Sequence, residues 1–301
     1  MRIFLITPIL FIFLVSCSNS EDFDIPKISK LEKLEEHSNQ FIKGIYSYDN
    51  GIHVAIGFGI ANSIMVEGEG GNIIIDTTDD VSQAKEVLSE FQKINQNPIK
   101  AIIYTHNHGD HVFGASEFYN AQEEKPLVIS HSTTAEKVEK ILGIINPIIT
   151  IRSGKMFGTN LDEDELINVG LGPYLSAGRS SPGYIAPTMT FEKELKLEIA
   201  GHKVELYHAP GETDDQLFVW FPELSALMPG DNFYTTFPNL YTIRGTSHRD
   251  VIGWVNSIDK MRSLDPQYLF PSHTMPVIGC LLYTSDAADE GLGVDLGGRR
   301  I

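Results

Sequence analysis

The sequence predicts an α+β domain in which two packed β-sheets carry helices on their outer faces. Short alternating apolar runs over residues 53–58, 61–67 and 72–76 are typical of a β-meander. Apolar residues at helical spacing follow over residues 81–91, and an apolar run over residues 99–104 then predicts a buried strand. Because strand and helix alternate after the meander, we expect two sheets packed together with helices outside.

The later elements follow from similar patterns. A hairpin-like run covers residues 195–207, and two short apolar strands follow at residues 226–228 and 268–270. Between those two strands, five apolar residues keep the spacing of an amphipathic helix, and we assign their stripe to the core: Val251, Trp254, Val255, Ile258 and Met261. Residues 150–187 are rich in glycine, proline and serine and predict a long loop, which in a compact domain is functional or disordered.

A dense group of ligand-type side chains follows the strand at residues 99–104. His106, His108, Asp110 and His111 lie within six positions. In a core each of these polar side chains would need its own hydrogen-bond partner, whereas imidazole nitrogens and carboxylate oxygens are zinc ligands. A single histidine is often a structural residue, but the density of this group predicts a metal site where a strand ends.

The pattern Thr-His-x-His-x-Asp-His at residues 105–111 resembles the signature of the metallo-β-lactamase superfamily. Three further positions match it in order, namely Glu212, Asp231 and His273. The resemblance implies an αββα sandwich over residues 41–279, truncated at its C-terminal side just after the last ligand. It also implies that Asp76 supports the metal loop from behind, and a plain carboxylate at a strand end is the alternative.

The superfamily pattern implies two zinc ions per chain. One ion would be held by His106, His108 and Glu212 and the other by Asp110, His111 and His273, with Asp231 bridging them. Such a pair stabilises an attacking and a leaving oxygen and generates a metal-bound hydroxide, so the implied chemistry is hydrolysis, with Asp110 and Asp231 as catalytic residues. Most relatives carry histidine at the position of Glu212, and the added negative charge should soften the Lewis acidity of the metals. Taken alone, Glu212 is more readily interpreted as a solvated loop carboxylate, and its place between Gly211 and Thr213 reverses that interpretation.

Glutamate at position 212 narrows the resemblance to the alkyl sulfatase branch of the superfamily. Three short strings support this branch: Gly-Tyr-Ile-Ala-Pro-Thr at residues 183–188, Pro-Asn-Leu-Tyr-Thr-Ile-Arg-Gly at residues 238–245, and Arg-Asp at residues 249–250. The string at residues 238–245 is more specific than the histidine motif. The branch implies a sulfate ester as the small-molecule substrate.

We expect Arg244 to bind the sulfate, because a planar guanidinium can donate to two of its oxygens where lysine offers a point charge. Asn239 and Tyr241, in the same string, would add neutral donors. The alternative is that Arg244 pairs with a carboxylate and only fixes its loop. The long loop at residues 150–187 would form a flap that contributes Tyr174 or Arg179, with a solvated loop as the alternative.

The charge of the chain restricts its partners. The 301 residues carry a formal net charge of −17. Such a surface repels nucleic acid, so we expect no nucleic-acid partner. It also repels a sulfate ester at long range, so recognition of an anion must depend on the metals and a few arginines.

The two ends of the sequence lie outside the predicted domain. Residues 1–16 have one positive charge, a short apolar run and the tetrapeptide Leu-Val-Ser-Cys, which resembles a bacterial lipoprotein signal with acylation at Cys17. We therefore expect a protein anchored by lipid in the bacterial cell envelope, facing the periplasm or the exterior, with residues 17–40 as a polar tether. An ordinary secretory signal is the alternative. Residues 280–301 resemble translated sequencing adapter, and similar full-length enzymes continue into a helical dimerisation region, which implies a native homodimer.

Three other functions remain open. The same metal motif also serves hydrolases of β-lactams, lactones or other esters. A surface lipoprotein that binds a ligand without catalysis is a second alternative, although no ligand position is lost. A redox di-iron site is the third, but such relatives usually carry glutamate at the position of His108.

Overall fold

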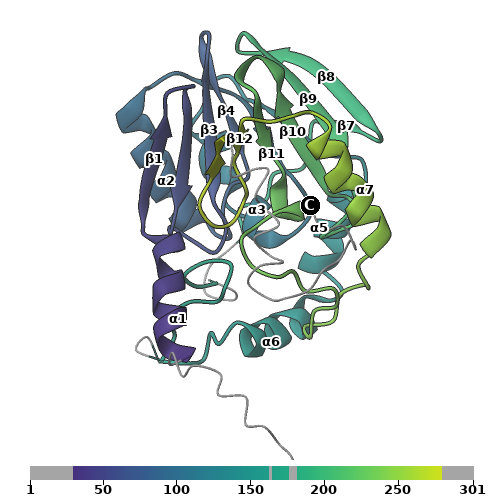
Figure 1. The fold of residues 1–301 in the computed structure, drawn as a ribbon. Helices are drawn as coiled ribbons and strands as arrows, with labels where there is room; N and C mark the ends of the chain where they lie inside the picture. Colours follow the sequence, from purple (N-terminus) through teal and green to yellow (C-terminus); the bar gives the residue numbers. More distant parts are fainter. Residues whose placement is uncertain (1–29, 163–164, 176–181, 280–301) are drawn as a thin grey trace, which may run out of the picture.

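The computed structural model describes residues 30–162, 165–175 and 182–279. Two β-sheets pack face to face, and helices cover their outer faces (Figure 1). The expected αββα sandwich is confirmed. The expectations for the signal at residues 1–16, for Cys17, for Arg179 and for residues 280–301 lie outside the described residues.

The first sheet has seven strands that are neighbours in sequence order. Its antiparallel meander is β1 (Gly44–Tyr48), β2 (Ile52–Ile56), β3 (Ser63–Gly68) and β4 (Gly71–Ile75), and its parallel part is β5 (Ile99–Ile103), β6 (Leu127–His131) and β7 (Met189–Phe191). Parallel strands need long connections, which are helical here. These connections contain α2 (Val81–Ile94), α3 (Gly109–Val112), α4 (Ala115–Asn120), α5 (Thr134–Leu142) and α6 (Asn146–Met156).

The second sheet has six strands in the order β13-β12-β11-β10-β9-β8. The strands are β8 (Glu194–Ile199), β9 (His202–His208), β10 (Leu217–Phe221), β11 (Ala226–Met228), β12 (Tyr268–Leu269) and β13 (Val277–Ile278). All neighbours are antiparallel except β11 and β12, which are parallel and are joined through α7 (Val251–Arg262).

Strand β4 shows how the sequence builds both layers of the core. Ile73 and Ile75 point into the space between the sheets, where they join Leu206 and other residues of the second sheet. Ile74 points to the opposite face and joins the cluster that α2 covers with Phe91. A strand buried on both faces must be apolar at every position, which explains the unbroken isoleucine run. Each such buried side chain contributes roughly 1.5–3 kcal/mol to stability.

The chain on the N-terminal side of the sheets is also ordered against the domain. Residues 30–40, which we assigned to the polar tether, form α1 (Lys30–His37) and most of a 3-10 turn, η1 (Ser38–Phe41). The Asn168 side chain donates to the carbonyl of Leu34 at 2.8 Å, and a His37 ring nitrogen lies 2.8 Å from the carbonyl of Gly170. Among the described helices, none is long and apolar enough to cross a membrane.

Two helices differ from the sequence-based expectation. Helix α6 extends to Met156, so the first residues of the expected loop at 150–187 are helical. Its sequence has proline only in the first turn, where proline is tolerated. In α7, Trp254 and Met261 are buried as expected, but Val251, Val255 and Ile258 are exposed, so the core assignment is wrong for these three. The helix touches the domain through the stripe of Trp254, Ser257 and Met261, and the adjacent apolar stripe faces away.

Two stacked histidines connect the ends of the two sheets. His131, the last residue of β6, stacks on His208, the last residue of β9, with ring centroids 4.2 Å apart. The Nε2 atom of His131 donates to the carbonyl of Glu192 at 3.1 Å, and its Nδ1 accepts from the Thr133 amide at 3.3 Å. Acceptance at Nδ1 requires the neutral ring, whereas Nε2 can donate in either form of the ring. Burial, followed by the neighbouring His208 ring, lowers the pKa of His131.

A lowered pKa at His131 makes stability depend on pH. Near pH 6.5 and below, this ring takes up a proton more readily in the unfolded chain than in the folded chain. The stabilising contribution of His131 to the free energy of unfolding is therefore complete above about pH 6.5 and is lost as the pH falls through that value. We expect His131→Gln to lose less free energy of unfolding than the wild type between about pH 7.5 and pH 5, measured by urea denaturation. His248→Gln, at an exposed position, should behave like the wild type. Equal losses in all three proteins would contradict the prediction.

Candidate active site

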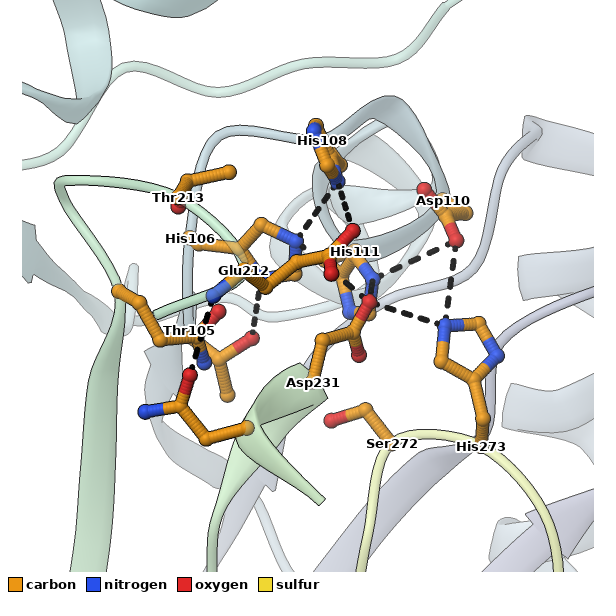
Figure 2. A network of polar contacts seen from close by, with 12 residues as sticks. Thr105, His106, His108, Asp110, His111, Glu212, Thr213, Asp231, Ser272 and His273 are labelled. Atoms are coloured by element: carbon orange, nitrogen blue, oxygen red, sulfur yellow. Dashed lines mark hydrogen bonds and ion pairs between the residues drawn. The ribbon is translucent and has the colours of Figure 1, made fainter. Parts of the chain in front are cut away.

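Loops from both sheets bring the seven predicted ligand residues together. His106 and His108 follow β5, and Asp110 and His111 lie in α3, directly after them. The second sheet supplies the others, with Glu212 between β9 and β10, Asp231 in the 3-10 turn after β11 (η3, Gly230–Asn232), and His273 after β12. Figure 2 shows these side chains converging on one small volume.

The ligand atoms form two groups of three, each with its atoms within 4.8 Å of one another. The first group is His106, His108 and Asp231, and the second is Asp110, His111 and His273. Asp231 also lies next to the second group, because its Oδ2 is 3.4 Å from His111 Nε2 and 3.1 Å from His273 Nε2. The second group is the one that the sequence implied, whereas in the first group Asp231 stands where the sequence implied Glu212. Asp231 lies between the two groups.

Asp76 holds the loops that carry these ligands. Its carboxylate accepts hydrogen bonds from the Thr105 amide at 2.9 Å and from the Ser272 hydroxyl at 2.7 Å. It also lies 2.7 Å from His111 Nδ1, which directs Nε2 of that ring toward the ligand group. The backbone of Asp76 is left-handed, with φ of 57°, a conformation that is rare for residues other than glycine, asparagine and aspartate. Of the two interpretations of Asp76, the contacts favour the supporting residue.

Glu212 lies at the edge of the first group and is paired with an arginine. Its Oε1 accepts from Arg249 Nη2 and is 3.7 Å from His108 Nδ1. Asn232 positions the backbone here, because its side chain accepts from the Glu212 amide at 3.2 Å and donates to the carbonyl of Ala209 at 2.7 Å. Glu212 is thus a buried carboxylate rather than the solvated one of the alternative interpretation. Its ligation of a metal stays a prediction.

We expect Arg249→Lys to lower the free energy of unfolding by about 1–2 kcal/mol. Arg249 donates to Glu212 and to the carbonyl of Asn239, and a lysine cannot hold both with one compact ammonium group. Urea denaturation of metal-depleted protein measures this effect without the contribution of bound ions. Arg262→Lys, whose ion pair with Asp259 is at the surface, should change stability by less than about 0.5 kcal/mol. Equal stability of Arg249→Lys and wild type would show that the pair contributes nothing.

The protonation equilibria at the site reflect its burial and its crowded charges. Burial, assisted by the neighbouring His111, lowers the pKa of His106 to about 3. Burial and then the nearby Asp231 raise the pKa of Glu212 to about 8, although Arg249 acts in the opposite direction. Burial lowers the pKa of His273, but Asp231 outweighs it and raises the value to about 8. Burial and the neighbouring charges therefore shift the pKa values of both carboxylates and imidazoles at this site.

Three buried atoms at the centre test whether metal ions fit this site. Glu212 Oε2, Asp231 Oδ1 and His111 Nε2 have no hydrogen-bond partner within the described part of the chain. Leaving three such atoms unsatisfied would be costly, and all three are of the types that coordinate zinc. The donor set therefore fits two metal ions, and the free oxygen of Glu212 is consistent with its predicted role as a ligand.

A cavity of about 710 Å³ opens onto the ligand groups. Its lining includes five of the candidate ligands, namely His108, Asp110, Glu212, Asp231 and His273. Eight apolar residues also line it: Phe113, Ile141, Leu142, Ile145, Ile149, Phe157, Leu171 and Leu175. Four cationic side chains, Lys137, Lys140, Arg244 and Arg249, also line the cavity, together with six acidic ones: Asp79, Asp110, Glu212, Asp214, Asp231 and Asp250.

The predicted substrate-binding residues are not all at this cavity. Arg244 lines it, with Nη2 3.1 Å from His108 Nε2, and the structure shows no carboxylate within ion-pair distance of it among the described residues. Asn239 and Tyr241 do not line the cavity, and Tyr241 is exposed. Tyr174 donates its hydroxyl to the carbonyl of Phe58 at 3.0 Å and also lies outside the lining. The expected flap is represented in the lining by Leu171, Leu175 and Pro182 instead.

Two residues that hold Glu212 and its loop were given no role from the sequence. Arg249 appeared only as part of a subfamily string, yet it is buried and binds Glu212. Asn232 directly follows Asp231 and shapes the Glu212 loop through three contacts, the third being its carbonyl, which accepts from Trp254 Nε1 at 3.0 Å. A glutamate predicted to lie in a buried site requires a cationic neighbour, and that rule could have indicated Arg249.

The sequence of this chain is similar to those of known proteins. The family model described as "Metallo-beta-lactamase superfamily" matches residues 56–273. A linear primary-alkylsulfatase of a Pseudomonas species is 40% identical over 221 residues, which are 71% of this chain and 42% of that protein. The chain thus spans less than half the length of this relative.

Solved structures show the same fold. The sec-alkylsulfatase Pisa1 from a Pseudomonas species superposes with a TM-score of 0.75 at 24% identity, covering 83% of this chain and 41% of that one. A metallo-beta-lactamase family protein from Thermus thermophilus gives a TM-score of 0.58 at 17% identity, covering 81% and 80%. At these identities the structures support the fold alone, whereas the sequence similarity confirms the resemblance to alkyl sulfatases.

Proposed function

Because this chain belongs to the metallo-beta-lactamase superfamily, we propose that it hydrolyses alkyl sulfate esters at a centre of two zinc ions. The alkylsulfatase relatives support the substrate class, and the two groups of ligand side chains support two metals. When bound, the zinc pair would supply an activated water and positive charge at the reacting oxygens.

One observation carries the proposal: a single cavity joins the ligand groups, an arginine and apolar residues. An alkyl sulfate has the same three parts, namely an ester to be cleaved, an anionic head and a hydrocarbon chain. The guanidinium of Arg244 lies at the boundary between the ligand side chains and the open cavity. A neutral ester would leave this cation without a matching group.

The residues around the candidate ligands have separate roles in binding the substrate and holding the ligands. Arg244 binds and orients the sulfate head, with its charge partly shielded from water. The apolar residues of α5 and α6 bind the alkyl chain and exclude water from the reaction. Arg249 keeps Glu212 in place through one of its oxygens, and Asp76 orients His111.

A direct comparison of substrates tests this function. The zinc-loaded protein is assayed with dodecyl sulfate and with a chromogenic β-lactam under the same conditions, and zinc content is measured in the same sample. We expect turnover of the sulfate ester only. Turnover of the β-lactam alone would replace this function by that of a lactamase, and no turnover of either at full zinc content would support a binding protein.

We also propose that the protein is a lipoprotein of the bacterial cell envelope, anchored through Cys17, and that the longer native chain forms a homodimer. The tetrapeptide Leu-Val-Ser-Cys at residues 14–17 supports the anchor. Expressed in a bacterium, the wild type should incorporate labelled palmitate and sediment with membranes, because one acylated cysteine carries several chains. Cys17→Ala should do neither, and its unchanged sedimentation with membranes would argue for another mode of retention.

A further inference from the structure

Helix α6 and the turn before it have some apolar side chains that line the cavity and others that are exposed to solvent. On the inner side, Ile145 and Ile149 line the cavity. On the outer side, Ile144, Ile148 and Ile151 are 87%, 56% and 64% exposed. Ile148 and Ile151 share one side of α6, and Ile144 lies in the turn just before the helix, so we call the three a strip of exposed isoleucines. Together with Arg152 and Lys155, this strip is named the outer face of α6.

This arrangement is unusual for the surface helix of a globular protein. Such a helix normally buries its apolar side and exposes polar residues. The buried residues of α6 are instead Ser153 and Gly154, while its isoleucines face either the cavity or the solvent. Single exposed apolar residues need no explanation, but a strip of three isoleucines indicates a contact surface.

The sequence that contains the strip is locally basic, and acidic residues begin on either side of it with Glu139 and Asp162. Residues 140–161 contain Lys140, Arg152 and Lys155 and no aspartate or glutamate, in a chain with a net charge of −17. Arg152 and Lys155 are exposed beside the isoleucines. An apolar strip flanked by cations matches the surface of a bilayer that contains anionic lipids, where both terms favour binding.

The position of α6 connects this surface to the cavity. The helix lies at the lower rim of the molecule in Figure 1, and the guanidinium of Arg152 lies next to Gly245, which lines the cavity. The helix that carries the outer face therefore also contributes to the cavity lining, through Ile149.

We propose that the outer face of α6 docks on the surface of an anionic lipid bilayer, from which a long-chain amphiphile enters the cavity. This inference goes beyond the proposed function, because the docking itself needs neither the metals nor hydrolysis. A soluble short-chain sulfate ester would reach the same cavity without docking.

A site-specific fluorescence experiment tests the docking. Ile148→Trp and Ile42→Trp place a probe at two positions that are equally exposed, at 56%, while the two native tryptophans are only 5% and 7% exposed. The full-length variants are mixed with vesicles of phosphatidylcholine and phosphatidylglycerol whose acyl chains are brominated and quench only an inserted ring. We expect a blue shift and at least about twofold quenching at position 148, and no change at position 42.

Two further arms separate the alternatives. Adding Arg152→Gln and Lys155→Gln to the Ile148→Trp protein should weaken vesicle binding by roughly 30-fold, as expected for two cations at an anionic surface. Equal quenching at positions 148 and 42 would overturn the proposal, because another segment would then hold the chain on the vesicle. A second result would also overturn the proposal: no quenching of the Ile148→Trp protein, together with a dimer in sedimentation. If the substitutions Ile144→Ser, Ile148→Ser and Ile151→Ser dissociate that dimer, the outer face of α6 binds a second copy of the chain.

The outcome is independent of the proposed hydrolysis. Quenching at position 148 without turnover of any sulfate ester would reject the hydrolase and keep the docking surface. Turnover of a short-chain sulfate ester without quenching would do the reverse.

Discussion

Asp231→Asn is expected to lower kcat/KM for an alkyl sulfate by at least about 10³-fold and to reduce the bound zinc to less than two ions per chain. The Asp231 carboxylate lies between the two ligand groups, with Oδ2 3.7 Å from His106 Nε2, 3.4 Å from His111 Nε2 and 3.1 Å from His273 Nε2. Asparagine keeps the size of the side chain but removes the charge that would hold two cations close together. Elemental analysis of purified protein and initial rates with dodecyl sulfate measure the two effects.

A second buried carboxylate provides the control for this experiment. Asp215 is as buried as Asp231, but its oxygens accept from the hydroxyls of Thr134 and Thr213, and it does not line the cavity. Asp215→Asn should therefore keep its zinc even if it is less stable. Full zinc content in Asp231→Asn would reject the assignment of Asp231 as the bridging ligand.

Arg244→Lys is expected to lower kcat/KM for an alkyl sulfate by an amount equivalent to about 2–3 kcal/mol of activation free energy, while kcat/KM for a neutral ester falls little. His108 presents Nδ1 toward His106 and Nε2 toward Arg244. An imidazole that coordinates a metal through Nδ1 keeps its proton on Nε2 and cannot accept a hydrogen bond there. Metal binding would thus leave the guanidinium free to donate to an anion in the cavity.

The comparison of substrates separates binding of sulfate from a structural role of Arg244. Rates for the sulfate and for a neutral ester of the same chain length are measured with both proteins, together with their melting temperatures. Equal losses on the two substrates, or a fall in melting temperature that accounts for the loss, would show that Arg244 is structural and that the choice of sulfate rests on resemblance.

Four of the candidate metal ligands were predictable because they depend only on residues that are close in sequence. The strand at residues 99–104 and the four ligands after it are adjacent in sequence, so periodicity and residue type suffice to predict them. Glu212, Asp231 and His273 needed the family pattern, since only the packing of the second sheet on the first brings them near His106. The sandwich followed from strand patterns that each bury one or two faces.

Other features depend on contacts that the sequence does not encode locally. Arg249 and Tyr174 are both polar residues in irregular segments, and only the folded chain shows that the first binds Glu212 and the second a backbone carbonyl away from the cavity. The exposed stripe of α7 and the isoleucines on the outer face of α6 have the composition of core residues. Periodicity reports which side chains share a face of a helix, but it does not report whether a neighbour covers that face.

Because the two sheets each contribute candidate ligands to one centre, zinc bound there would act as a cross-link that exists only in the folded chain. An ion that binds the native state but not the unfolded one adds RT ln(1 + [Zn]/Kd) to the free energy of unfolding, about 2.7 kcal/mol at a hundredfold excess over Kd. Resistance of the sandwich to heat and proteases thereby becomes a measure of the free metal around it. In an environment poor in zinc, the molecules that fail to acquire the metal would also be the first to unfold.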